Sequence, residues 1–243
     1  MSARGEERDD SDVETSSEGY AGRFSGSVGA FFLEAQSATT LDLLRGWPRA
    51  RVLDVGGGHG QVTGPLVNAG YDVTVLGSAD ACRQRVAPWV DAGRARFEAG
   101  DLLQLPFPDG SFDIALSYRL LPHVSRWPRL VAELARVAHR AVLVDYPTSR
   151  SFNALSGLFF GLKKGVEGNT RPFRVFRDGE IVGAFATHGY APTARRPQFL
   201  LPMALHRALG LASVARTLEG TAAGLGLTGL LGSPVILRLE PRS

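Results

Sequence analysis

The sequence has a single cysteine, Cys82, among its 243 residues. One cysteine excludes an intramolecular disulfide framework and is typical of a reducing compartment. No apolar run approaches the roughly 20 residues of a membrane-spanning helix, and no basic segment leads into an apolar one near the start. Histidine, cysteine and carboxylate residues nowhere gather at metal-ligand spacing. We therefore expect a cytoplasmic protein with no metal site.

Charge is also sparse, and it is unevenly distributed. Charged residues make up 21% of the chain, and the net charge is only +3. Residues 1–18 hold seven acidic side chains against two arginines and offer little to bury, so we expect a disordered acidic tail there. The arginines of the last hundred residues are scattered and belong to no recognisable nucleic-acid module. We expect no nucleic-acid partner.

What the chain does have is enough apolar material for a sizeable core. With 44% hydrophobic residues over this length, it suits one α/β domain. Residues 19–47 are rich in phenylalanine and leucine and predict one or two helices that cover the domain of residues 48–243.

The most informative stretch is residues 51–60, Arg-Val-Leu-Asp-Val-Gly-Gly-Gly-His-Gly. Val52, Leu53 and Val55 are typical of a strand buried on both faces of a sheet. The glycines that follow let the backbone turn sharply and approach a ligand without side-chain clash. Residues 61–70 can continue as a helix. Strand, glycine turn and helix indicate a nucleotide-type site at the carboxyl end of a parallel strand.

The spacing of these glycines selects the kind of nucleotide. It lacks the final x-x-G of a dinucleotide fingerprint, and an aspartate two residues before the first glycine suits a ligand with a cationic end. The stretch resembles the first motif, D-x-G-x-G-x-G, of the class I S-adenosylmethionine-dependent methyltransferases. That resemblance implies that Asp54 positions the loop and neighbours the methionine ammonium group. It implies that Gly56, Gly58 and Gly60 lie against the methionine and ribose moieties. A nicotinamide-dependent oxidoreductase is the disfavoured alternative.

A second run carries the same resemblance. Residues 100–113, Gly-Asp-Leu-Leu-Gln-Leu-Pro-Phe-Pro-Asp-Gly-Ser-Phe-Asp, are similar to the G-D-x-x-x-L-P-F-x-D-x-S-F-D run of small-molecule methyltransferases. The family implies that Asp101 accepts from the adenine amino group and that the Leu102 backbone N–H donates to the ring; a turn or cap role is the alternative for Asp101. The fold implied is a Rossmann-like seven-stranded, mostly parallel sheet with helices on both faces and an antiparallel last strand.

The chain departs from the family at the end of the second strand, which we predict over residues 71–76. The family usually has an acidic residue there that binds both ribose hydroxyls, whereas this chain has Gly77. Either Asp80 reaches back from the loop, or Ser78 and backbone groups substitute. The usual proline-glycine-glycine turn before the fifth strand is also missing. These departures leave open a catalytically silent cofactor-binding or regulatory subunit.

The fourth strand, predicted over residues 114–117, ends where the family places the transferable methyl group. Ser117 is therefore a candidate cofactor contact, and His123 is the candidate for orienting the acceptor or removing its proton. In this family an insertion, here about residues 148–180, commonly builds the acceptor pocket. The candidate substrate contacts come from the cover helices, the fourth and fifth strand ends and the insertion: Tyr20, Tyr118, Arg119, Tyr146, Phe159, Phe160, Asn169, Arg171 and Phe173.

These features together predict an S-adenosylmethionine-dependent methyltransferase, with S-adenosylhomocysteine as product, that acts on a small and fairly hydrophobic molecule. Whether oxygen, nitrogen or carbon is methylated stays open. The apolar residues 152–173 include Lys163 and Lys164 and keep a membrane-lipid or quinone methyltransferase as an alternative.

Overall fold

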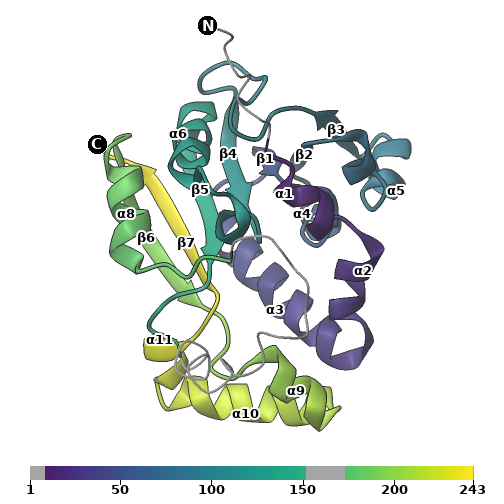
Figure 1. Ribbon diagram of the computed structural model, residues 1–243, viewed down its shortest axis with the longest axis vertical. Coiled ribbons are helices and arrows are strands. Elements are labelled where there is room, and N and C mark those ends of the chain that lie inside the picture. Colours follow the sequence, from purple (N-terminus) through teal and green to yellow (C-terminus); the bar gives the residue numbers. More distant parts are fainter. Residues whose placement is uncertain (1–8, 152–172, 243) are drawn as a thin grey trace, which may run out of the picture.

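The computed structural model describes residues 9–151 and 173–242, and within them one sheet organises the molecule (Figure 1). Its order is β3-β2-β1-β4-β5-β7-β6. All neighbouring strands pair in parallel except β7, which is antiparallel to both β5 and β6. The strands are β1 (Arg51–Val55), β2 (Asp72–Gly77), β3 (Ala95–Ala99), β4 (Phe112–Ser117), β5 (Ala138–Tyr146), β6 (Tyr190–Pro197) and β7 (Val235–Pro241). The predicted fold class, antiparallel last strand included, is confirmed.

Helices cover both faces of this sheet (Figure 1). The described residues form α1 (Ser11–Thr15), α2 (Glu18–Ala21), α3 (Gly26–Leu44), α4 (Thr63–Asn68), α5 (Ala87–Asp91), α6 (Trp127–Val137), α8 (Asp178–Ala186), α9 (Met203–Leu209), α10 (Ala212–Gly224) and α11 (Leu227–Leu231). Short 3₁₀ turns are η1 (Gly22–Phe24), η2 (Gly57–His59), η3 (Asp80–Arg83) and η4 (Leu121–His123). In this part of the chain, no helix has the length and apolar character needed to cross a membrane.

The central strands are buried on both faces, because successive side chains of a strand point to opposite sides. Leu53 and Val55 of β1 join the core cluster that α6 and α8 cover. Val52 of the same strand joins the cluster under α3 and α4. A third, smaller cluster packs Phe31 and Phe32 of α3 against Phe199 and α10. The apolar residues of β1 therefore pack into two core clusters, one on each face of the sheet.

One prediction about the elements was wrong. Residues 9–18 were expected to be disordered, but they contain α1, in which Asp12 is fully buried; residues 1–8 lie outside the described residues. The reason is that the Asp12 carboxylate accepts a hydrogen bond from the Ser78 backbone N–H at 2.8 Å. Farther along the chain, Gly210 adopts a left-handed φ of 70° and ends α9, so that α9 and α10 are separate helices.

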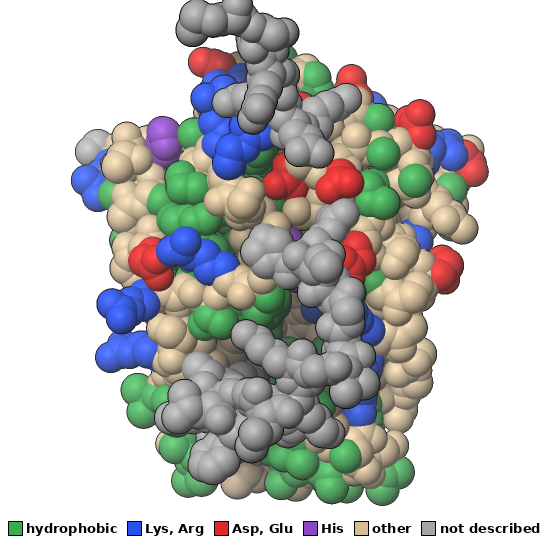
Figure 2. Space-filling model, in the orientation of Figure 1, with side chains coloured by type: hydrophobic (Ala, Val, Ile, Leu, Met, Phe, Trp, Pro, Cys, Tyr) green, Lys and Arg blue, Asp and Glu red, His purple; other side chains and the backbone are tan. Residues whose placement is uncertain are grey.

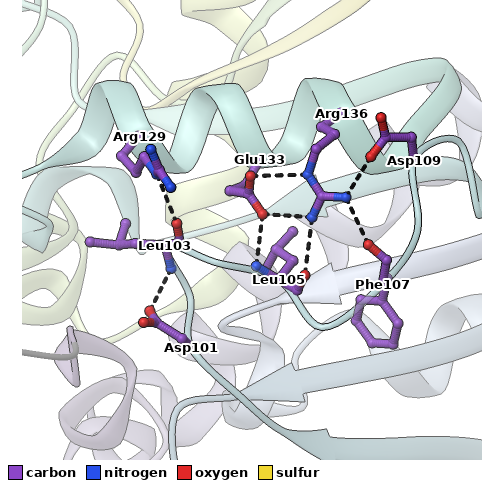
Figure 3. A network of polar contacts seen from close by, with 8 residues as sticks. All are labelled: Asp101, Leu103, Leu105, Phe107, Asp109, Arg129, Glu133 and Arg136. Carbon is purple, nitrogen blue, oxygen red and sulfur yellow. Dashed lines mark hydrogen bonds and ion pairs between the residues drawn. The ribbon is translucent and has the colours of Figure 1, made fainter.

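Helix α6 holds the loop between β3 and β4 through a charged pair (Figure 3). The Glu133 carboxylate accepts from the Leu105 N–H at 2.7 Å. Arg136 donates to the same carboxylate at 2.7 Å and to the Phe107 carbonyl at 2.7 Å. Burial raises the pKa of Glu133, but the hydrogen bonds from Arg136 and Leu105 outweigh it, so the net pKa lies below its usual range. The pair therefore fixes the loop that begins at Asp101.

We predict that Arg136→Ala lowers the free energy of unfolding by about 1–3 kcal/mol, because it leaves the nearly buried Glu133 without its charged donor. Urea denaturation at neutral pH measures this, and Arg45→Ala, on an exposed side chain at the end of α3, serves as control. Since the folded pKa of Glu133 is lowered, the pair's contribution is present above about pH 4.3 and is lost as the pH falls below it. Equal unfolding curves for the two variants would contradict the role given to Arg136.

Candidate functional site

The glycine turn after β1 is fastened to its surroundings by its backbone. Gly56 and Gly60 adopt left-handed φ angles of 73° and 69°, and the Gly56 N–H donates to the Leu76 carbonyl of β2 at 2.8 Å. A Cβ at Gly58 would lie 2.3 Å from the Ser16 Oγ and 2.6 Å from the Cys82 carbonyl oxygen. No side chain fits at that position. The sequence motif therefore forms the tight turn that it predicts, packed between α1 and η3.

Asp54, on β1 two residues before Gly56, is the most unusual group of the site. It is fully buried, and neither of its carboxylate oxygens has a hydrogen-bond partner among the described residues. Burial raises its pKa to about 8. Buried polar atoms in folded proteins nearly always have partners, so two unpartnered acceptor oxygens call for a donor from outside the chain. A cationic ligand group beside Asp54 meets that requirement.

A carboxylate does lie at the end of β2, but it belongs to Asp12 and not to a residue near the end of the strand. The Ser78 N–H donates to Asp12 of α1, whereas Asp80 is exposed at the start of η3. The ribose-binding roles of Asp80 and Ser78 stay predictions. Sequence reasoning missed Asp12, because nothing in its local composition separates it from the other acidic residues of the first 18.

Asp101 takes the place expected of it, at the start of the loop after β3. Its Oδ1 accepts from the Leu103 N–H at 2.8 Å (Figure 3), so the turn role that we kept as an alternative is present. The residue also lines a polar recess of about 130 Å³ together with Gln104, Arg126 and Arg129. The side chain of Leu102 is fully buried, so only its backbone N–H remains as a candidate ligand contact. The adenine roles of both residues stay predictions.

Ser117 links the ends of β1 and β4 through a side-chain hydrogen bond. Its hydroxyl is buried and donates to the Val55 carbonyl at 3.0 Å. Because β1 and β4 are neighbours in the sheet, this bond joins the last residue of one strand to the last residue of the other. The hydroxyl proton of Ser117 is thus used within the fold, and only its oxygen lone pairs remain to accept from a ligand.

A cavity of about 230 Å³ lies beyond the ends of β4, β5 and β7. Its walls are mostly aromatic and aliphatic side chains, namely Tyr20, Phe32, Pro122, Pro147, Phe173, Phe199, Leu201, Met203, Pro234 and Ile236. Six polar side chains also line it: Gln36, Arg119, His123, Asp145, Gln198 and Ser233. Such a combination of apolar walls and a few convergent polar groups is typical of a small-molecule site.

Arg119 forms the polar end of this cavity together with Asp145. Its backbone has a positive φ of 58°, rare for a residue with a Cβ, and its N–H donates to the Asp145 carboxylate at 2.6 Å. The guanidinium donates to the Gln36 side-chain carbonyl and lies 4.2 Å from the ring centroid of Phe24. Burial raises the pKa of Asp145, and the charge of Arg119 opposes that rise. The strained backbone and its acidic partner together hold the arginine at the cavity.

Known proteins resemble this chain in both sequence and structure. A family model described as a methyltransferase domain matches residues 53–143. The structure superposes on magnesium protoporphyrin IX methyltransferase from Synechocystis PCC 6803, which was solved with bound SAH, with a TM-score of 0.65 and 16% identity over 94% of this chain and 96% of that one. At that identity the likeness concerns the fold alone.

The sequence of one curated relative decides the family. Demethylmenaquinone methyltransferase from Beutenbergia cavernae is 31% identical over 209 residues, which are 77% of this chain and 82% of the relative. The chain belongs to the S-adenosylmethionine-dependent methyltransferases. Another demethylmenaquinone methyltransferase, from Deinococcus radiodurans, is 32% identical over half of this chain and 58% of its own length. The methyltransferase is therefore an enzyme whose cofactor is S-adenosylmethionine.

Some of the predicted substrate contacts do not line the cavity of this methyltransferase. Tyr118 is buried, and its hydroxyl is hydrogen-bonded to the Thr40 hydroxyl of α3 at 3.0 Å. Tyr146 is buried as well and donates to the Asp178 carboxylate at 3.0 Å. Both side chains pack into the cores under the covering helices, so their assignment to the substrate was wrong for this cavity. Phe159, Phe160, Asn169 and Arg171 lie outside the described residues.

The remaining substrate predictions agree with the cavity. Tyr20, Arg119, His123 and Phe173 all line it, although they come from three separate parts of the chain. Sequence reasoning missed Gln36, Phe32 and Phe199. Both phenylalanines lie in apolar stretches, which predicts that they are buried. The sequence cannot distinguish a buried residue of the core from one of a cavity wall, because both are apolar.

We predict that cofactor binding releases a proton near neutral pH. Burial holds the pKa of Asp54 at about 8 in the free methyltransferase, so the carboxyl group is largely protonated at pH 7. An ammonium group beside it favours the ionised form, which makes the affinity rise between about pH 6 and about pH 8. Calorimetry at pH 7 in buffers of different ionisation enthalpy counts the protons.

In the same experiment Asp54→Asn is expected to weaken binding at least about tenfold and to abolish the proton release. Asp91→Asn, which alters an exposed carboxylate at the end of α5, controls for the change of charge. An unchanged affinity and proton count in Asp54→Asn would remove Asp54 from the cofactor site.

Proposed function

We propose that this methyltransferase transfers the methyl group of S-adenosylmethionine to a small, largely apolar molecule bound in the 230 Å³ cavity. The observation that carries the proposal is the composition of the cavity, apolar along its walls and polar at the end formed by Arg119 and Asp145. A cavity of this size suits a small-molecule acceptor better than a protein or a nucleic acid.

The chain's own residues have mainly to align the acceptor. S-adenosylmethionine supplies a methyl group that is already activated as a sulfonium, so orientation accounts for most of what the protein must add. His123 lies on η4, directly after β4, and its ring stands 5.6 Å from that of Phe173. This places an imidazole at the cavity, where it orients an acceptor or takes its proton. The guanidinium of Arg119 suits an acceptor with an anionic or carbonyl oxygen.

A quinone-type acceptor at a membrane surface is a second candidate. Two relatives are named demethylmenaquinone methyltransferases. Hydrophobic side chains also gather at the end of the molecule where α9–α11 lie (Figure 2). The exposed leucines of that end are Leu205, Leu209, Leu211, Leu218, Leu225, Leu227 and Leu230. Co-sedimentation with liposomes tests this candidate: binding that weakens when Leu225 and Leu230 are replaced by serine favours it, and a fully soluble protein speaks against it.

We predict that His123→Ala lowers turnover at least about tenfold while the affinity for S-adenosylhomocysteine changes less than about twofold. The assay follows the labelled methyl group of S-adenosylmethionine into a panel of phenols, quinols, carboxylic acids and amines, which also identifies the acceptor atom. His188→Ala, at an exposed position after α8, is the matched control. Unchanged turnover in His123→Ala would make His123 a structural residue, and transfer to no acceptor would favour the silent-subunit alternative.

A further inference from the structure

Helix α1 rests directly on the glycine turn and on the end of β2 (Figure 1). The Ser16 Oγ touches Gly58 so closely that a Cβ there would lie 2.3 Å away. At the other end of the helix, the Ser11 hydroxyl donates to the His123 carbonyl at 3.0 Å. The short segment thus bridges the cofactor loop and the loop that carries the candidate catalytic histidine.

Asp12 is the residue of α1 that points to a ligand. It is fully buried. One carboxylate oxygen accepts from the Ser78 N–H at 2.8 Å and from the Cys82 thiol at 3.4 Å, whereas Oδ1 has no partner among the described residues. Burial raises the pKa of Asp12, whereas the Ser78 hydroxyl interacts with this carboxylate and lowers that pKa, but the two groups make no hydrogen bond of ordinary geometry. A buried carboxylate oxygen without a well-formed hydrogen bond is unfavourable, so Asp12 Oδ1 has capacity for a stronger donor from a ligand.

The end of β2 explains why that carboxylate comes from a distant segment. A Cβ at Gly77 would lie 2.5 Å from the Cβ of Cys82 and 3.2 Å from the ring of Phe97. The position therefore cannot hold an acidic side chain without moving η3 or β3. Asp12 brings its carboxylate to the backbone N–H of Ser78, the residue directly after Gly77. It thereby supplies a carboxylate at the strand end where the chain has glycine instead of an acidic residue.

We propose that Asp12 supplies the carboxylate that binds the ribose hydroxyls of S-adenosylmethionine, in place of an acid at the end of β2. The two hydroxyls are donors, and the unpartnered Asp12 Oδ1 is an acceptor. It lies at the end of β2, the neighbour of the strand that carries Asp54. The two buried carboxylates then divide the donors of the cofactor, Asp54 taking the ammonium and Asp12 the diol. The assignment rests on the cofactor role of the function proposed above. It makes α1 a part of the binding site that must remain in place when the cofactor is bound.

The first test compares S-adenosylhomocysteine with its 2′-deoxy counterpart by calorimetry on the full chain. Wild type is expected to prefer the ribose form by about 10- to 100-fold, as for a hydrogen bond to a charged group. Asp12→Asn should bind S-adenosylhomocysteine correspondingly more weakly and lose the preference. Asp10→Asn, an exposed residue of the same segment with the same change of charge, should behave as wild type.

The outcomes separate this assignment from the proposed function. If Asp12→Asn binds S-adenosylhomocysteine as tightly as wild type and keeps the ribose preference, Asp12 does not bind the diol, while the methyltransferase remains. Tighter binding by Asp12→Asn also overturns the assignment, because α1 would then be a plug that the cofactor displaces. Wild type that binds neither compound refutes the cofactor role itself.

A second test needs no variant. Cys82 is the single cysteine of the chain, is fully buried and contacts Asp12, so its reaction with a thiol reagent reports whether α1 stays in place. The assignment predicts that saturating S-adenosylhomocysteine slows the labelling of Cys82 at least about threefold, because the bound ribose holds α1 down. Faster labelling with the ligand present would show that α1 leaves, and would overturn the assignment.

Discussion

Burial of an unpartnered carboxylate at the centre of the sheet is the constraint around which the site is built. Asp54 follows Val52 and Leu53 of β1 and has no donor among the described residues. Such a group weakens the fold, because it must either ionise without a partner or remain protonated at neutral pH. The neighbouring apolar residues of β1, β2 and β4 contribute the burial that offsets it. The strain is local to the ligand site, as is common where binding requires it.

Around this carboxylate the parallel strands bring separate parts of the sequence to one edge. The turn after β1, the end of β2, the loop after β3 and the turn after β4 all emerge at the carboxyl side of the sheet. Arg119 and Asp145 extend the same edge to the acceptor cavity. The residues that we propose for the cofactor and for the acceptor are therefore neighbours because of the strand order, although more than a hundred residues separate α1 from β5.

The sequence predicted those parts whose signal is local. The apolar run and glycines of residues 52–60 predict a buried strand and a tight turn, because few other structures accommodate that pattern. The change from β5 to an antiparallel β7 followed only from the family resemblance. Asp12 was missed because its burial depends on a partner, Ser78, that is 66 residues away. Tyr118 and Arg119 are adjacent in sequence, but only the fold shows that the first enters the core and the second the cavity.

The most direct test of this account is a calorimetric titration of the purified protein with S-adenosylmethionine, S-adenosylhomocysteine and NADH. We propose that the two buried carboxylates near the glycine turn, Asp54 and Asp12, bind an ammonium group and a ribose; both disfavour a pyrophosphate beside them, because like charges repel. We therefore expect the first two compounds to bind and NADH not to bind. Binding of NADH, or of none of the three, would contradict the assignment of this site to S-adenosylmethionine.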